Sequence, residues 1–254
     1  MIPATTTMLT ESAVADAVPR MELESWREAG FRAGITSRQG DFDLGLFADG
    51  RAGKVLGNWL AFQASQQGTF PGIAVARQVH GTRIQSHEDT CNRWLVSDGF
   101  DGHLAASPGF LLGVTVADCV PVYLAHPETG TVALLHAGWR GTASGILEAG
   151  LQRLTGRAQC KASDVRMHCG VGICGDCYEV DSDVYEQVTG QPSRGRAKLD
   201  LRAALRDRAV RAGVRDLSVS TWCSSHHADL FFSHRRSGGK EGRMLAYLGW
   251  LGPG

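Results

Sequence analysis

Residues 110–141, FLLGVTVADCVPVYLAHPETGTVALLHAGWRG, constrain the fold of this chain more than any other segment. Two apolar runs rich in β-branched residues, 110–116 and 120–125, flank the tripeptide ADC, and a third run at 131–136 follows a Pro-Glu-Thr-Gly turn. Strands that are apolar along their whole length are expected where both faces of a sheet are covered. The segment therefore predicts three strands inside a layered structure.

Helical and strand patterns alternate along the rest of the chain. Helical spacing of apolar residues is found at 54–67, 142–154 and 200–212, whereas 31–40, 72–84, 217–223 and 244–251 are typical of strands. No repeat or Pro/Ser-rich linker divides these elements. We therefore expect an α/β fold with one catalytic domain over residues 26–254, preceded by a loosely ordered leader at residues 1–25.

Charge and cysteine content exclude several classes of protein. The formal net charge is zero, whereas nucleic-acid binders usually carry a basic excess. No apolar run is long enough to span a bilayer, and the N-terminus lacks the pattern of a signal peptide. Seven cysteines without a secretion signal indicate reduced thiols. The sequence predicts a cytoplasmic protein with a small-molecule substrate and no nucleic-acid or membrane partner, and leaves its oligomeric state open.

Three residues that can bind a metal lie at the expected ends of strands. His80, Cys119 and His136 offer two imidazoles and a thiolate, which zinc prefers. Three protein ligands leave one coordination position open, as in catalytic zinc sites. Asp118, next to the cysteine, is a candidate proton carrier or hydrogen-bond acceptor beside the metal.

The spacing of these residues leaves other interpretations open. A buried cysteine and histidines at the ends of strands are common without any metal. Cys119 could also act as a nucleophile with His136 as its base. A further pattern, Cys169, Cys174 and Cys177 with Cys223, has the C-x4-C-x2-C spacing of an iron–sulfur protein, although the intervening GVGI is typical of a strand.

Two glycine-bearing segments carry arginines that could bind an anion. Arg140 lies in HAGWRGT, at the expected start of a helix, and Arg235, Arg236 and Arg243 lie in SHRRSGGKEGR. Backbone N–H groups and guanidinium groups together suit phosphate or carboxylate. The alternative interpretation is a solvated loop with surface arginines.

Several motifs together resemble one family. They are RQVHG (77–81), ADCVPVYL (117–124), LLHAGWRGT (134–142), CYEV (177–180), LDL (199–201) and FFSHRRSGGKEGR (231–243). The family is known as the laccase-domain or multicopper polyphenol oxidase family, and also as the purine nucleoside phosphorylase or peptidoglycan editing factor family. The resemblance extends from about residue 31 to the C-terminus.

The resemblance implies a single domain of layered mixed β-sheets flanked by helices, similar to cysteine-hydrolase-like folds. It implies metal ligands at His80, Cys119 and His136, and substrate contacts at Arg38 and Asn58. The chain departs from the family pattern at 39–41, 101–105 and 170–174. One of these departures introduces His103, an extra imidazole that we expect near the site.

The leading prediction is a zinc-dependent purine nucleoside phosphorylase or adenosine deaminase acting on adenosine, inosine and methylthioadenosine, as the resemblance implies. One alternative is a copper-dependent polyphenol oxidase, because thiolate and imidazole also accept copper. Another is a hydrolase that edits mis-incorporated peptidoglycan precursors. The last is a non-catalytic, metal-stabilised protein that binds a metabolite.

Overall fold

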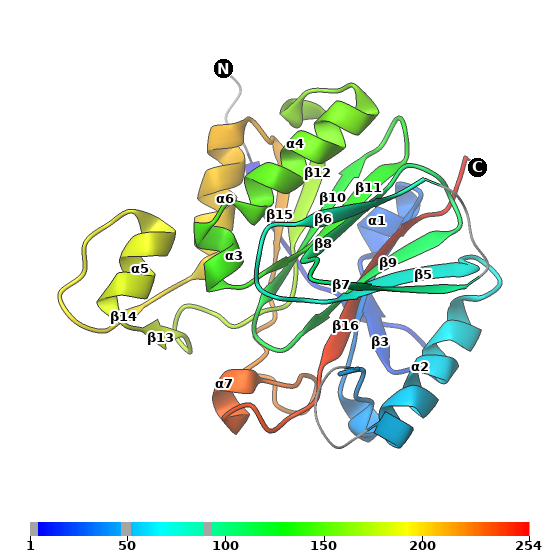
Figure 1. Ribbon diagram of the computed structural model, residues 1–254, viewed down its shortest axis with the longest axis horizontal. Helices are drawn as coiled ribbons and strands as arrows, with labels where there is room; N and C mark the ends of the chain where they lie inside the picture. Colours follow the sequence, from blue (N-terminus) through cyan, green and yellow to red (C-terminus); the bar gives the residue numbers. More distant parts are fainter. Residues whose placement is uncertain (1–4, 47–51, 89–92, 254) are drawn as a thin grey trace.

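The protein is described here by a computed structural model covering residues 5–46, 52–88 and 93–253. Two seven-stranded mixed sheets pack face to face, and helices cover their outer faces (Figure 1). This arrangement confirms the expected α/β fold of one domain with layered mixed sheets. Among the described helices, none is both long and apolar enough to cross a membrane.

The first sheet contains two of the three strands of the opening segment, those predicted at 120–125 and 131–136. Its strands, in spatial order, are β1 (Thr5–Leu9), β15 (Asp216–Ser220), β12 (Arg166–Cys169), β10 (Val120–His126), β11 (Thr131–Ala137), β8 (Gly102–Ala105) and β6 (Ile84–His87). β10 and β11 form an antiparallel hairpin in which Pro121 lies opposite His136. The turn predicted at Pro-Glu-Thr-Gly therefore connects two neighbouring strands.

The second sheet is built around the C-terminal strand. Its strands, in spatial order, are β2 (Ser12–Ala13), β3 (Arg20–Glu22), β4 (Phe31–Thr36), β16 (Met244–Trp250), β9 (Phe110–Val116), β5 (Gly72–Arg77) and β7 (Trp94–Asp98). β16 lies between β4 and β9 and is antiparallel to both. A separate two-stranded ribbon pairs β13 (Glu179–Val180) with β14 (Ala197–Lys198).

Seven helices accompany the sheets in the described part of the chain. They are α1 (Glu24–Glu28), α2 (Ala52–Gln66), α3 (Trp139–Ala143), α4 (Ile146–Ala158), α5 (Ser182–Thr189), α6 (Leu201–Ala212) and α7 (His234–Ser237), with 3-10 turns at Gln39–Asp41 and Ala162–Asp164. α4 and α6 pack on the first sheet, and α2 packs on the second (Figure 1). Their apolar faces complete two outer cores.

The central strand β10 is apolar along most of its length because both of its faces are buried. Along β10, Val122 and Leu124 pack toward the helices, while Tyr123 and Ala125 pack toward the other sheet. Successive side chains of a strand point to opposite faces, so a strand between two cores needs an apolar residue at every position. This confirms the expectation drawn from residues 110–141.

Two predicted elements are divided in the structure. The helix expected at 142–154 is two helices, α3 and α4, separated at Gly145, whose φ of 89° is a left-handed conformation that favours glycine. The strand or hairpin expected at 72–84 becomes β5 and β6, which belong to different sheets. The apolar pattern is common to both arrangements, so it could not distinguish them.

The first 25 residues contribute strands, where the sequence suggested a loosely ordered leader. β1 pairs in parallel with β15, and β2 and β3 continue the edge of the second sheet. Between them Glu11 is buried and bonds to His168 Nε2 at 3.1 Å and to Ser220 Oγ at 2.7 Å. These contacts anchor the described part of the N-terminal segment to the first sheet.

His103 lies in the core of the fold and does not line the candidate site, contrary to expectation. It is buried on β8, where its Nδ1 lies 3.0 Å from Nε2 of His87 on β6. Burial lowers the pKa of His87 to about 4. Burial and the charge of His87 lower the pKa of His103 to about 3.

This histidine pair is expected to make stability depend on pH. The unfolded chain takes up protons below about pH 6.5, whereas the folded pair stays neutral until near pH 4, so acid favours unfolding. Between pH 7 and pH 5 each histidine should reduce the free energy of unfolding by about 2 kcal/mol. Urea denaturation at both pH values checks this, and a His87→Leu/His103→Leu variant should lose most of the dependence. An unchanged dependence in that variant would contradict the assignment.

Candidate active site

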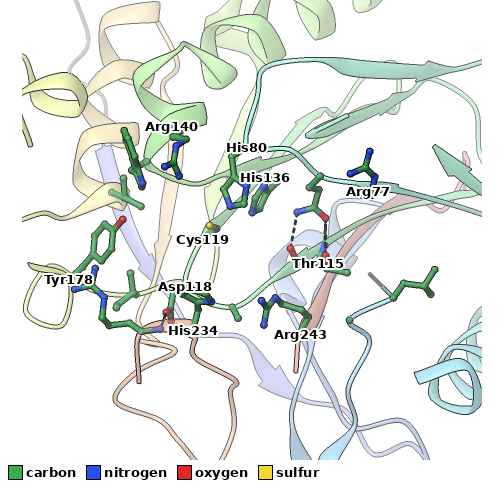
Figure 2. A pocket seen from close by; sticks show the side chains of 18 residues that line it. Arg77, His80, Thr115, Asp118, Cys119, His136, Arg140, Tyr178, His234 and Arg243 are labelled. Carbon is green, nitrogen blue, oxygen red and sulfur yellow. Dashed lines mark hydrogen bonds between the residues drawn. The ribbon is translucent and has the colours of Figure 1, made fainter. Parts of the chain in front are cut away.

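The candidate site lies where the chain crosses twice from the second sheet to the first. His80 follows β5 on the way to β6, and Cys119 lies between β9 and β10. His136 belongs to β11, the neighbour of β10. The side chain of Gln78 holds the two crossings together by pairing with both backbone groups of Thr115, at 2.8 and 2.9 Å (Figure 2). Three residues distant in the sequence are thereby brought to one place.

His80, Cys119 and His136 point toward one another at the wall of a pocket (Figure 2). One ligand atom from each lies within 4.8 Å of the others. The two imidazole rings meet edge to face, with centroids 4.9 Å apart. His136 is buried and His80 is exposed, so the group can be reached from the pocket. The structure therefore brings together the three residues that the sequence singled out as metal ligands.

Asp101 holds both histidines, His80 and His136, in place, a role that the sequence did not reveal. Its buried carboxylate accepts the backbone N–H groups of Val79, His80 and Gly81 at 3.1, 2.9 and 2.7 Å. These bonds stabilise a turn in which His80 has a φ of 60°, which is uncommon for a residue with a side chain. No motif or spacing links Asp101 to this turn, so only the fold could identify it.

The same carboxylate orients His136. Oδ1 of Asp101 lies 2.9 Å from Nδ1 of His136, which leaves Nε2 free to face Cys119. Burial opposes the charge of Asp101, but the hydrogen bonds from His136 and Gly81 lower its pKa below the usual value. A carboxylate that fixes the tautomer of a histidine is a common support for histidine ligands of metals.

The surroundings of Cys119 favour its thiolate form. Burial alone would raise its pKa, but the nearby charge of His136 and hydrogen bonds from both histidines lower it to about 6. In turn, burial lowers the pKa of His136, and the thiolate and Asp101 outweigh this and raise it to about 9. The thiolate is the form that binds metals and acts as a nucleophile.

Room for an ion depends on a glycine beside the three side chains. A Cβ atom at Gly138 would lie 3.0 Å from the sulfur of Cys119 and 3.0 Å from Cδ2 of His80. Any larger residue would thus push against both ligands. The soft donor set, the separations within 4.8 Å and this open space fit a metal held by three protein ligands.

A cavity of about 580 Å³ adjoins the three ligands. Four arginines line it: Arg77, Arg140, Arg235 and Arg243. Arg77 is paired with Asp98, and Arg235 and Arg243 donate to backbone carbonyls. Arg140 is exposed, and its guanidinium carbon lies 4.3 Å from the centre of the Trp139 ring. The cavity thus combines the three ligands with several positive charges.

Aromatic residues form part of the same wall. Trp139 and Tyr178 both line the cavity, and the guanidinium of Arg235 lies 4.8 Å from the centre of the Tyr178 ring. Burial and the nearby Cys119 raise the pKa of Tyr178 to about 12, so the phenol stays neutral. Flat aromatic surfaces beside cationic groups suit a ligand that has both a ring and an anionic part.

Asp118 lies in the cavity wall, with both of its carboxylate oxygens bonded. Oδ1 accepts Ser224 Oγ at 2.6 Å, and Oδ2 accepts the backbone N–H of Arg235 at 2.6 Å. Its φ of 87° is in the left-handed region. These contacts tie the turn before Cys119 to the start of α7. They indicate a positioning role, and its predicted role as a proton carrier remains untested.

Three predicted substrate contacts lie outside this cavity. Arg38 is paired with Glu241 at 2.8 Å and lines a separate, smaller depression. Asn58 on α2 donates to the carbonyl of Asp43 at 3.0 Å. Arg236 donates to the carbonyls of Ser224, Ser225 and Phe231, and pairs with Glu241. These contacts hold loops together, whereas the predicted residues Arg140, Arg235 and Arg243 do reach the cavity.

The iron–sulfur ligand set that the cysteine spacing left open does not assemble. Cys169 is buried on β12 within the core, where burial raises its pKa to about 12. The GVGI segment before Cys174 is also not a strand, since only Gly172 makes an isolated bridge, to Cys223. Cys174, Cys177 and Cys223 do approach one another, and they are joined by His226.

Comparisons with known proteins identify relatives over most of the chain. A family model described as "Multi-copper polyphenol oxidoreductase laccase" matches residues 24–251. The protein named purine nucleoside phosphorylase YlmD of Geobacillus stearothermophilus is 34% identical over 87% of this chain and 90% of its own length. A protein named adenosine deaminase RL5, from an unknown prokaryotic organism, is 33% identical over 68% of this chain and 73% of its own length. The crystal structure of YlmD from Geobacillus stearothermophilus superposes with a TM-score of 0.84 at 30% identity, covering 94% of this chain and 99% of that one.

Proposed function

The chain belongs to the multi-copper polyphenol oxidoreductase laccase family, and we propose that it is a metal-dependent enzyme that cleaves purine nucleosides by phosphorolysis. Similarity to a relative named purine nucleoside phosphorylase supports the substrate class. The observation that carries the reaction type is the set of four arginines around a cavity that also has aromatic walls. Adenosine, inosine and methylthioadenosine are the proposed substrates.

His80, Cys119 and His136 would hold the metal, which we propose is zinc, with copper as the alternative. A zinc ion with three protein ligands supplies Lewis-acid chemistry at its open position. Asp101 would keep the histidine donors oriented toward the ion, because it binds Nδ1 of His136 and the backbone around His80.

The arginines would bind and position phosphate. Inorganic phosphate is mostly a dianion at neutral pH and is held well by several guanidinium groups. Arg140, Arg235 and Arg243 would hold it beside the sugar, while Trp139 and Tyr178 would stack with the purine. A phosphate oxygen then forms a bond to C1′ as the glycosidic bond to N9 breaks, and the purine takes up a proton.

Arg140 is the arginine whose loss should most directly weaken phosphate binding. An Arg140→Ala variant is expected to raise the KM for phosphate about 10- to 100-fold, the value of a hydrogen bond to a charged group. The assay measures release of free base from inosine against phosphate concentration. Arg206→Ala removes a partly exposed arginine of α6 that pairs with Asp207 and does not line the cavity, and it should leave that KM unchanged.

Other outcomes of this assay would overturn the proposal. Release of ammonia from adenosine at a rate that does not depend on phosphate would identify a deaminase. Oxygen uptake with phenols and no nucleoside turnover would identify an oxidase. An equal KM for phosphate in Arg140→Ala and wild type would exclude Arg140 from phosphate binding.

Deamination of adenosine is the second candidate for this site. The relative named adenosine deaminase RL5 supports it, as does a metal position with an open coordination site. The same cavity would bind the nucleoside, and water would replace phosphate as the attacking group. Comparing inosine and adenine as products of adenosine, with and without phosphate, separates the two reactions.

A further inference from the structure

A second group of metal-binding side chains lies apart from the proposed active site. It consists of Cys174, Cys177, Cys223 and His226, and one donor atom of each lies within 4.8 Å of the others. We propose that these four residues bind a structural Zn²⁺. The proposal does not depend on the function proposed above.

The spacing of the four residues is that of a zinc site built from two short segments. Cys174 and Cys177 form a C-x2-C pair, and Cys223 and His226 form a C-x2-H pair. Structural zinc sites commonly use two such pairs, and Cys3His is one of their usual ligand sets. The iron–sulfur interpretation grouped Cys174 and Cys177 with Cys169. In the structure, the fourth donor beside Cys174, Cys177 and Cys223 is His226 instead.

The backbone holds the two segments together independently of any ion. Gly172 bridges to Cys223, and the N–H of Ser224 donates to the carbonyl of Gly172 at 3.1 Å. The N–H of Cys177 donates to the carbonyl of Cys174 at 3.1 Å, which closes the turn between the first two sulfurs. The pairs are therefore presented to each other by the fold.

The donor atoms have separations that suit tetrahedral coordination. The sulfur of Cys174 lies 3.7 Å from Nδ1 of His226. With the usual Zn–S and Zn–N bond lengths, these two atoms would be about 3.5 Å apart on a tetrahedron. The backbone N–H of Cys174 also donates to the sulfur of Cys223 at 3.3 Å, a contact that supports a negatively charged thiolate ligand.

The number of donors indicates a structural ion. Four protein ligands fill the tetrahedron and leave no position for substrate, in contrast to the three ligands around Cys119. Cys223 is buried, while His226 is exposed, so an ion can enter from the surface. The thiolate-rich set favours zinc over hard cations such as magnesium.

The position of the site would link this ion to the proposed active site. Ile173 and Tyr178, which flank the C-x2-C pair on either side, both line the cavity. Ser224, directly after Cys223, bonds to the carboxylate of Asp118 at 2.6 Å. An ion at this site would therefore brace the cavity wall that faces Cys119.

Counting zinc in a Cys119→Ser background tests the site separately from the active site. Full-length Cys119→Ser protein, loaded with Zn²⁺ alone and desalted, is expected to retain one zinc per chain by elemental analysis. Adding Cys223→Ser or His226→Ala should lower the retained zinc at least 10-fold. Adding Cys160→Ser, at a partly exposed cysteine that follows α4, should not change it.

Two further measurements keep the test decisive if a variant does not fold. In the Cys119→Ser protein itself, Co²⁺ should give the charge-transfer absorption of three thiolates, and a strong chelator should lower Tm by roughly 10 °C. Failure to bind Zn²⁺ or Co²⁺ in that folded protein would overturn the proposal. So would an iron–sulfur absorption spectrum, or a disulfide shown by two missing thiols after denaturation without reductant.

Discussion

A Cys119→Ser substitution is expected to lower nucleoside turnover by more than about 100-fold and to remove the metal from the active site. Loss of an outer hydrogen bond to a ligand already costs 10- to 100-fold in affinity, and loss of the ligand itself should cost more. The hydroxyl of serine stays protonated at neutral pH, so it cannot replace the thiolate whose pKa is lowered to about 6. Turnover of inosine with phosphate and elemental analysis of the active-site metal check both parts.

Cys160→Ser is the matched control for this substitution. Cys160 is a partly exposed free thiol on the outside of the fold, where burial and a nearby Asp164 raise its pKa. Its loss should leave turnover and metal content as in wild type. Full activity in Cys119→Ser would exclude the three ligands from the reaction. Loss of activity with the metal retained would instead indicate that the sulfur acts as a nucleophile.

An Asp101→Ala substitution is expected to cause the largest loss of stability of any single change near the site. It would leave three backbone N–H groups and one imidazole N–H without their buried acceptor. Removing one partner of a buried charged pair typically costs about 3 to 5 kcal/mol. Metal affinity should also fall about 10- to 100-fold, because His136 loses the group that orients it. Urea denaturation and zinc titration measure the two effects.

Two other substitutions serve as controls for Asp101→Ala. Asp101→Asn keeps an oxygen acceptor in the same volume and should recover part of the stability while metal affinity stays reduced. Asp216→Ala removes an exposed carboxylate that is paired with Arg166, and should change the free energy of unfolding by no more than about 0.5 kcal/mol. A stability loss for Asp101→Ala as small as that for Asp216→Ala would show that the carboxylate does not hold the turn.

The two groups of metal-binding side chains differ in what the sequence could reveal. Cys174 and Cys177 with Cys223 and His226 form two local pairs, so their spacing alone could have predicted a zinc site. The iron–sulfur pattern obscured this because it included Cys169, which belongs to the core. His80, Cys119 and His136 share no local spacing, so residue type and their place at strand ends only suggested a metal site, and the resemblance to a family strengthened that prediction.

The sequence predicted the buried strands correctly, because burial on both faces requires a run of mostly apolar residues. The runs at 110–116, 120–125 and 131–136 are apolar at most positions because each strand lies between two cores, and this pattern is readable without a structure. Which strands share a sheet was not readable, because crossing between sheets needs only a short connection such as the ADC turn. The site lies at those crossings, so its supporting residue Asp101 was missed.

The assignment of substrate-binding arginines was limited for a similar reason. Arg235 and Arg236 are adjacent in the sequence, yet Arg235 lines the cavity and Arg236 binds carbonyls of the neighbouring loop. Successive residues of a short helix such as α7 point in different directions. Only the packing of the loop decides which of the two guanidinium groups can meet a ligand.

The central position of β16 has a consequence for how the protein forms during translation. β16 is the last described strand in chain order, yet it separates β4 from β9 in the middle of the second sheet. Until the ribosome has released it, those two apolar strands have no partner at that position, and β1 must likewise wait for β15. Such long-range pairing slows folding and leaves unpaired, aggregation-prone strand edges exposed. A nascent chain of this protein should therefore depend on chaperones at least until β16 has been synthesised.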